Sequence, residues 1–305
     1  MGGRKECLRA LSDLFLVRRC PVCGRELLRH EGRLCLPCAA DLPLTYFWLL
    51  SRNPMADRFN ARLVAGLTAE DAGTALESSI PPGTDSPLPG RGGETAAAAP
   101  YYIYAAALFY YRSEAGYAAI PKALKYHADF GMGRHYAALL GRFLAGSAVF
   151  RDITAVVPVP LHPWRRLQRG YNQAAVIARC VAAELGVPVL TGFLRRRRYT
   201  RTQTRLSVAQ KQRNVAGAFV PTRRAAALSM KRPVLMDCPP DLAGLSMKRP
   251  IFMDCPGLPG GGGVHLLLVD DVYTTGATLE ACFRVLQALY PAARISIATL
   301  AVVQE

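Results

Sequence analysis

Two adjacent acids followed by a run of hydroxyl side chains stand near the C-terminus of the chain. The acids come directly after the apolar residues 266–269, and the full run is Asp270, Asp271, Val272, Tyr273, Thr274, Thr275, Gly276, Ala277 and Thr278. Glycine permits a tight turn, and threonine hydroxyls donate hydrogen bonds to an anion. Carboxylates beside such a turn suit a ligand with vicinal hydroxyls and a phosphate, held together with Mg²⁺. A ribose 5-phosphate has these groups.

The elements around this run are predicted from the hydrophobic pattern. Residues 266–269 form a short continuous apolar run, which is typical of a strand buried on both faces of a parallel sheet. We expect this strand to end at the two acids, a turn at 272–278, and a helix over 277–289. The N-terminus of such a helix attracts anions, because its first N–H groups and its dipole face the loop. The competing interpretation is that the Asp and Thr side chains only cap the helix.

Four cysteines near the N-terminus have the spacing of a metal site. Cys20 and Cys23 form one Cys-x-x-Cys pair, and Cys35 and Cys38 form another after eleven intervening residues. Two such pairs can hold one tetrahedral Zn²⁺, as in zinc ribbons, and the site would be structural because all four positions are filled. A redox role for one pair is the alternative.

Length, composition and charge set broad limits on the protein. The chain has 305 residues, of which 51% are hydrophobic, and it has nine cysteines, four of them in the metal pattern. No apolar run approaches the roughly 18 residues of a membrane span. The apolar stretch at 8–17 is too short and too often interrupted for a signal peptide. We therefore expect a cytoplasmic protein.

Basic residues are concentrated in one segment. The net charge is +16, and residues 158–214 contain twelve Arg and Lys against the single acid Glu184, so +11 of the charge lies there. Such a concentration predicts an anionic partner. With Trp164, Tyr171 and Tyr199 as stacking surfaces, the same segment favours a second hypothesis, a factor that handles single-stranded DNA.

The composition also suggests how the chain is divided. We expect an N-terminal helix and zinc ribbon at 1–60, a flexible linker at 61–100, and an α/β domain at 101–305 with a surface insert at 222–263. The insert contains a duplication: residues 228–239 and 245–256 differ at two of twelve positions. We assign no function to this repeat.

Several motifs, taken together and in their order along the chain, resemble those of a known family. The run at 270–278 resembles the phosphoribosyl-pyrophosphate (PRPP) motif of type I phosphoribosyltransferases. Together with the cysteine pairs and further motifs, it resembles the ComF (competence protein F) family, which joins a zinc ribbon to a phosphoribosyltransferase-like domain. The further motifs are LKY at 124–126, VPVPLH at 157–162, RGYNQ at 169–173, TxxQ at 200–203 and NVxGAF at 214–219.

The resemblance implies a fold, a ligand and site residues. It implies a mostly parallel sheet with helices on both faces, and pentosyl transfer from PRPP with Mg²⁺. By position, Asp270 and Asp271 would contact the ribose, residues 272–278 would form the binding loop, and residues 160–169 would bind the pyrophosphate through Pro160, Leu161, Arg165 and Arg169. Residues 198–211 correspond to a mobile flap, with Lys211 where the family usually has arginine. The family is linked to DNA uptake, so the uptake machinery is an expected partner.

Overall fold

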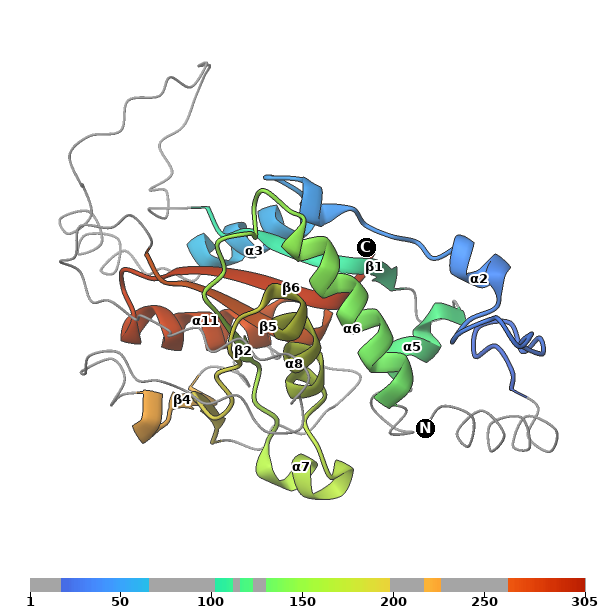
Figure 1. Cartoon of the computed structure of the whole chain (residues 1–305). Helices are drawn as coiled ribbons and strands as arrows, with labels where there is room; N and C mark the ends of the chain where they lie inside the picture. The colour runs from blue at the N-terminus through green and yellow to red at the C-terminus, as the bar shows by residue number, and fades with distance from the viewer. Residues whose placement is uncertain are drawn as a thin grey trace, which may run out of the picture.

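Two long parallel strands lie at the centre of the fold (Figure 1). The strands β5 (His265–Tyr273) and β6 (Arg294–Val303) are flanked by β1 (Ala105–Tyr111) and β2 (Ala155–Pro158), in the order β1-β6-β5-β2, with every pairing parallel. The computed structural model describes residues 18–65, 102–111, 116–122, 130–197, 217–225 and 263–304. The predicted α/β class with a parallel sheet is confirmed.

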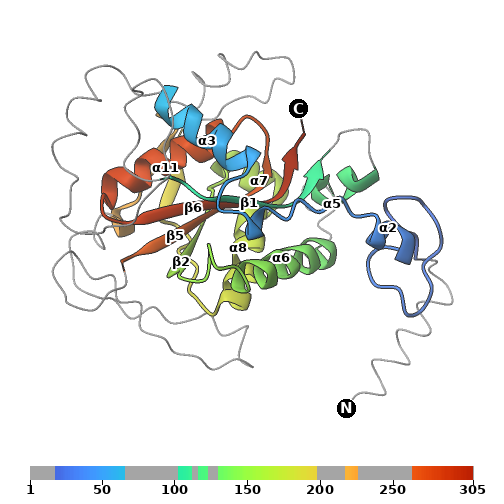
Figure 2. The ribbon, with the colours of Figure 1, turned by 90° about the horizontal axis from the view of Figure 1, so that it is seen from above.

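Helices cover both faces of this sheet (Figure 2). On one face lie α3 (Pro54–Ala65) and α11 (Ala277–Leu289), and on the other lie α6 (Phe130–Ala145) and α8 (Gln173–Leu185). The shorter elements are α2 (Leu36–Ala40), η1 (Phe47–Leu49), η2 (Gly116–Ala118), α5 (Ala119–Lys122), α7 (Pro163–Arg169), β3 (Leu194–Arg196) and β4 (Phe219–Pro221). Among the described residues, no helix is both long and apolar enough to cross a bilayer.

The alternation of side chains along β5 divides the apolar core in two. Leu266 and Leu268 pack on the face covered by α3 and α11, whereas Leu267 and Val269 pack on the face covered by α6 and α8. A strand buried on both faces needs apolar residues at consecutive positions, and this explains the continuous apolar run in the sequence. All four side chains are fully buried.

The strand β5 is longer than the sequence predicts. It does not end at the two acids but continues to Tyr273, because β6 runs alongside it and supplies backbone partners as far as Val302. Asp270 pairs with Thr299, and Tyr273 pairs with Val302. The turn is therefore confined to residues 274–276, and the helix at 277–289 begins where the pattern predicts.

The segment that precedes β1 in the sequence covers the open edge of β1. Leu44 forms an antiparallel bridge with Phe109, and the side chain of Asn53 donates to the Ala105 carbonyl at 2.9 Å. The helix α3 then runs to Ala65 and packs Phe59 and Leu63 into the sheet core. The first five residues of the predicted linker are thus helical, and its remainder lies outside the described residues, as do the predicted N-terminal helix before residue 18 and the duplicated segment.

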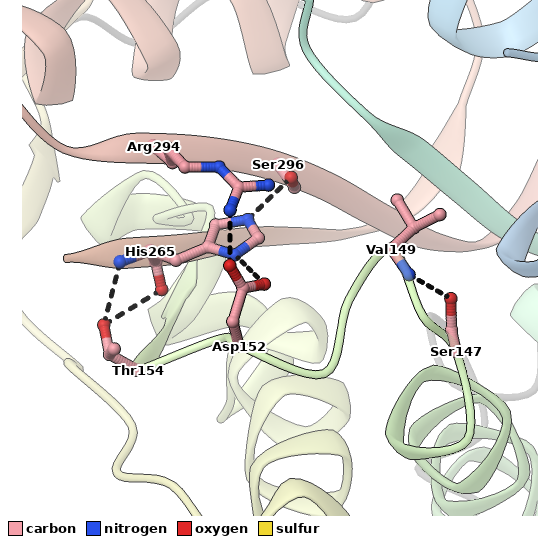
Figure 3. A network of polar contacts seen from close by, with 7 residues as sticks. All are labelled: Ser147, Val149, Asp152, Thr154, His265, Arg294 and Ser296. Atoms are coloured by element: carbon pink, nitrogen blue, oxygen red, sulfur yellow. Dashed lines mark hydrogen bonds and ion pairs between the residues drawn. The ribbon is translucent and has the colours of Figure 1, made fainter. Parts of the chain in front are cut away.

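A polar network joins the amino ends of β5 and β6 (Figure 3). The imidazole of His265, which is 1% exposed, bonds through Nδ1 to Asp152 Oδ1 and through Nε2 to Ser296 Oγ, both at 2.8 Å. Asp152 also pairs with Arg294, and Thr154 bonds to the backbone of His265. Burial lowers the pKa of His265, and the Asp152 carboxylate opposes that shift. The network therefore holds a neutral imidazole.

We expect the network to make stability depend on pH. Because the pKa of His265 is lower in the folded protein than its usual 6.5, the unfolded chain binds a proton first as the pH falls. Stability is then full above pH 6.5 and declines below it, by at most about 1.4 kcal/mol per pH unit for one proton. Urea denaturation at several pH values should show this slope, and His265→Asn should make it shallower. Equal slopes in the two proteins would contradict the assignment.

Candidate functional site

The end of β5, the turn that follows it and the start of α11 hold the acids and hydroxyls that the sequence predicts as a site. Gly276 is buried, has φ of 75°, and is the residue from which α11 starts. The first helical hydrogen bond runs from the Glu280 N–H to the Gly276 carbonyl at 2.8 Å. The preceding N–H groups of the helix face the turn, as they do at the N-terminus of any α-helix. Thr274 is exposed, and Thr275 and Thr278 are half-buried, so the hydroxyl-bearing residues border solvent.

The ring of Tyr273 lies directly against Gly276 in this turn. Its side chain is buried, and a Cβ added at Gly276 would lie only 2.7 Å from the Tyr273 hydroxyl oxygen. The position therefore excludes other side chains both by contact and by its positive φ. The guanidinium carbon of Arg58 lies 5.6 Å from the centroid of the same ring. Glycine, tyrosine and an arginine from α3 together fix the shape of the turn.

The two acids lie at the carboxyl end of the central strand. Asp270 and Asp271 are both half-buried, and the Asp271 N–H donates to Asp270 Oδ1 at 2.9 Å. In open parallel sheets, ligands bind outside the carboxyl ends of the strands. The two acids thus lie at the edge of the sheet where ligands of such folds bind, shortly before the start of α11.

A cluster of basic side chains from two other elements approaches Asp270. The guanidinium of Arg196, on β3, has a pKa lowered by burial and by the charge of Arg165, whereas Asp270 raises it. The pKa of His162 is lowered by burial and by the charges of Arg196 and Arg165. Arg196 thus lies within electrostatic range of both Arg165 and Asp270. Arg165 was predicted as a site residue, but Arg196 was identified only as part of the basic segment.

Of the predicted pyrophosphate-binding residues, Arg165 and Arg169 lie in a short helix, and Pro160 and Leu161 precede it. Pro160 and Leu161 are half-buried in the link after β2, and α7 then begins at Pro163, because His162 Nδ1 accepts the Trp164 N–H at 3.2 Å. Proline is favourable at the first helical position, which explains why this turn forms a helix. Arg169 is the last residue of α7 and is half-buried.

The outer side of α7 is apolar and exposed. Trp164 is 54% exposed and Leu167 is 76% exposed, and they lie three residues apart, on one side of the helix. Arg166 between them is also exposed. Figure 1 shows α7 projecting from the body of the sheet. The remaining motif residues at 124–126, 200–203 and 214, and the flap with Lys211, lie outside the described residues.

The four predicted cysteines come together in a group that can hold a metal ion. The sulfur atoms of Cys20, Cys23, Cys35 and Cys38 all lie within 4.8 Å of one another, and those of Cys23 and Cys35 are 3.6 Å apart. Zinc–sulfur bonds of 2.3 Å in a tetrahedron place sulfurs about 3.8 Å apart, so the spacing fits such an ion. Burial opposes ionisation of Cys20, but backbone N–H donors outweigh it and lower its pKa to about 6, which favours the metal-binding thiolate.

A buried glutamate connects the two halves of the cysteine group. The carboxylate of Glu31 is 3% exposed and accepts hydrogen bonds from the Leu28 N–H at 2.8 Å and the Leu36 N–H at 2.7 Å. It also bonds to the guanidinium of Arg25 at 3.0 Å. Arg25 follows the first cysteine pair, and Leu36 lies inside the second, so Glu31 links both. The sequence gives no sign of this role, since an isolated glutamate in a loop is usually exposed.

The cysteine group is attached closely to the sheet domain. Three of its cysteines, Cys20, Cys35 and Cys38, belong to the apolar cluster beneath α6 and α8. The Tyr117 hydroxyl donates to the Cys38 carbonyl at 3.1 Å. A Cβ at Gly116 would overlap the backbone carbonyl of Val22, so the two parts meet without space for a side chain.

Comparison with known proteins gives one informative similarity. No family model matches the chain. A stretch of 135 residues, 44% of the chain, is 27% identical to Competence protein F of Haemophilus influenzae. The aligned region spans 44% of that protein, less than half of its length, so the relationship concerns part of each chain.

We expect Glu31 to control how tightly the cysteine group retains metal. The two carboxylate oxygens of Glu31 accept the hydrogen bonds that connect the two cysteine pairs. Glu31→Gln replaces one of these oxygens with an amide NH2 group, which cannot accept. Groups that orient metal ligands typically change metal affinity about tenfold to a hundredfold when they are lost. Chelator competition monitored by metal analysis should show weaker retention in this variant. The matched control is Glu26→Gln, since Glu26 is exposed in the same loop. Equal retention in the two variants would contradict the role of Glu31.

Proposed function

We propose that this chain is a ComF-like protein of the phosphoribosyltransferase family that binds PRPP with Mg²⁺ at residues 270–278. One observation supports the proposal: Asp270 and Asp271 lie in the last four residues of the central parallel strand, and a turn of three residues then leads into α11. Carboxylates for sugar hydroxyls and a helix N-terminus for a phosphate thus occur within nine consecutive residues at the carboxyl end of the sheet.

Each part of the ligand has a complementary group in this site. The 5′-phosphate would accept hydrogen bonds from the N-terminal N–H groups of α11 and from the hydroxyls of Thr274, Thr275 and Thr278. The carboxylates of Asp270 and Asp271 would accept hydrogen bonds from the ribose 2- and 3-hydroxyls. Mg²⁺, when bound, would supply positive charge that offsets the charge of the pyrophosphate.

The basic cluster suits the other end of the ligand. Arg196 lies within electrostatic range of both Asp270 and Arg165, and both arginines are half-buried. Guanidinium groups bind phosphate oxygens in pairs of hydrogen bonds and remain charged at any relevant pH. In pentosyl transfer, the bond from the anomeric carbon to the pyrophosphate oxygen breaks as an acceptor forms its own bond to that carbon. In the proposal, the arginines would stabilise the departing pyrophosphate, and the carboxylates would stabilise the positive charge on the sugar.

The relationship to Competence protein F supports a role in competence. That protein is named for this process, and the motifs of the present chain resemble the family linked to DNA uptake. We propose that the chain serves DNA uptake in transformation, with PRPP binding as its biochemical activity.

We further propose that the cysteine group holds one structural Zn²⁺. Four thiolates with tetrahedral spacing are the ligand set that zinc prefers in closed structural sites. The metal analysis described for the Glu31 variant also identifies the ion, and iron in place of zinc would contradict this assignment.

The exposed side of α7 favours a second candidate function, the handling of single-stranded DNA. The exposed indole of Trp164 offers a stacking surface for a base, and Arg166, exposed on the same helix, offers a charge for a phosphate. In this alternative, the PRPP pocket has a regulatory role or is a vestige of one.

PRPP binding is tested by calorimetry with Mg²⁺ present. Wild type should bind PRPP, and the double variant Asp270→Asn with Asp271→Asn should not, although it should still fold, since both acids border solvent. Thr275→Val should weaken binding by about 1–3 kcal/mol, the cost of one lost donor to a buried anion. If wild type binds neither PRPP nor ribose 5-phosphate, the proposal is wrong and the second candidate takes its place.

DNA binding is tested by the salt dependence of the affinity for a single-stranded oligonucleotide. Arg166→Ala should reduce the log–log slope by about 0.7, the value for one phosphate contact. Trp164→Ala should weaken binding by about 1–3 kcal/mol if a base stacks on the indole. Leu49→Ala, which removes another exposed apolar side chain, serves as the control. No change in any variant would exclude α7 from this role.

A further inference from the structure

An acid lies in the first turn of α11, close to the proposed phosphate site. Glu280 is the fourth residue of the helix, and its backbone N–H bonds to Gly276, so it stands one turn from the binding loop. Its side chain is only 15% exposed. A carboxylate at this place is favourable for the helix dipole, but it repels a second anion at the same helix end. An uncompensated Glu280 would therefore weaken phosphate binding.

Two arginines compensate this charge, and they do so from different environments. Arg62 of α3 brings its Nε to 2.5 Å from Glu280 Oε2, and its side chain is 11% exposed. Arg284 bonds to Oε1 at 3.1 and 3.2 Å, and its side chain is 37% exposed. Solvent and salt screen the exposed pair more than the buried one. Arg62 is thus the stronger of the two compensating charges.

The helix α3 holds Arg62 firmly in this place. Phe59, three residues earlier, is fully buried and meets Phe283 of α11 edge-on, with ring centroids 5.8 Å apart. The amide of Asn60 exchanges two hydrogen bonds of 2.9 Å with the backbone of Ile103, next to β1. Arg284 also donates to the Leu63 carbonyl at 3.0 Å. The contact between α3 and α11 is therefore both apolar and charged.

From this geometry we infer that Arg62 is a positioning residue that keeps the first turn of α11 able to bind a phosphate, by neutralising Glu280. The inference rests on the proposed function, because it concerns the anion bound at residues 274–278. It assigns to α3, a helix that lies before the sheet domain in the sequence, a direct influence on the affinity of the site.

A purely structural ion pair between Arg62 and Glu280 would behave differently. The two cases differ in whether removal of the Glu280 charge weakens or strengthens phosphate binding. If the pair only fastened α3 to α11, the loss of either partner would loosen the contact and weaken ligand binding. If the charge of Glu280 matters, its removal must leave phosphate binding unchanged or make it tighter. Removal of Arg62 alone must weaken binding, and removal of both partners must restore it.

The experiment is calorimetry with ribose 5-phosphate and with PRPP and Mg²⁺ on a set of variants. Arg62→Gln should bind about tenfold more weakly, as expected for one poorly screened unit charge near a site. Glu280→Gln should bind at least as tightly as wild type, and Arg62→Gln with Glu280→Gln should return to within about twofold of it. Arg62→Lys, which keeps the charge, should stay near wild type. Arg284→Gln is the matched control and should lose less than about threefold.

The outcomes separate the inference from the function on which it rests. If Glu280→Gln weakens binding as much as Arg62→Gln, and the double variant is not restored, the pair is structural and the inference is overturned, while PRPP binding stands. If wild type binds neither ligand, the proposed function fails and the inference fails with it. If Arg62→Gln does not fold, Glu280→Gln and Arg62→Lys still show whether phosphate affinity depends on the charges of this pair as inferred.

Discussion

The parallel pairing of β5 with β6 is the constraint on which the candidate site depends. Because β6 continues to Val303, β5 keeps its backbone partners through Tyr273, and the two acids are carried as part of a paired strand. Their place relative to the start of α11 is then set by a turn of three residues. The His265 network fixes the other end of the same two strands. A shift of register between β5 and β6 would displace every group that we assign to the ligand.

The residues before β1 pack against both faces of the sheet. The cysteine group packs beneath α6 and α8, whereas α3 packs beside α11 on the opposite face of the sheet. A metal-stabilised module and a site-supporting helix thus lie within one continuous segment that also covers the edge of β1. Loss of metal would be felt first in the core beneath α6 and α8, and not at the turn after β5.

The sequence predicts the features that arise from neighbouring residues. The apolar run at 266–269, the glycine that starts α11 and the paired cysteines are local patterns, and the structure places each as expected. The prediction that β5 ends at the acids was wrong, because the pairing with β6, and not the polarity of Asp270, determines where the strand ends. Two interactions join residues that are far apart in the chain, so no local sequence pattern predicts them. These are the ion pair of Arg62 with Glu280 and the proximity of Arg196 to Arg165.

Backbone hydrogen exchange with and without PRPP and Mg²⁺ tests the central claim most directly, because it locates the ligand without any substitution. We predict slower exchange of the N–H groups at 275–279, where the helix starts, with little change at the amino ends of β5 and β6. Protection confined to α7 and β3, with residues 275–279 unchanged, would contradict the account and place the anion on the basic segment instead.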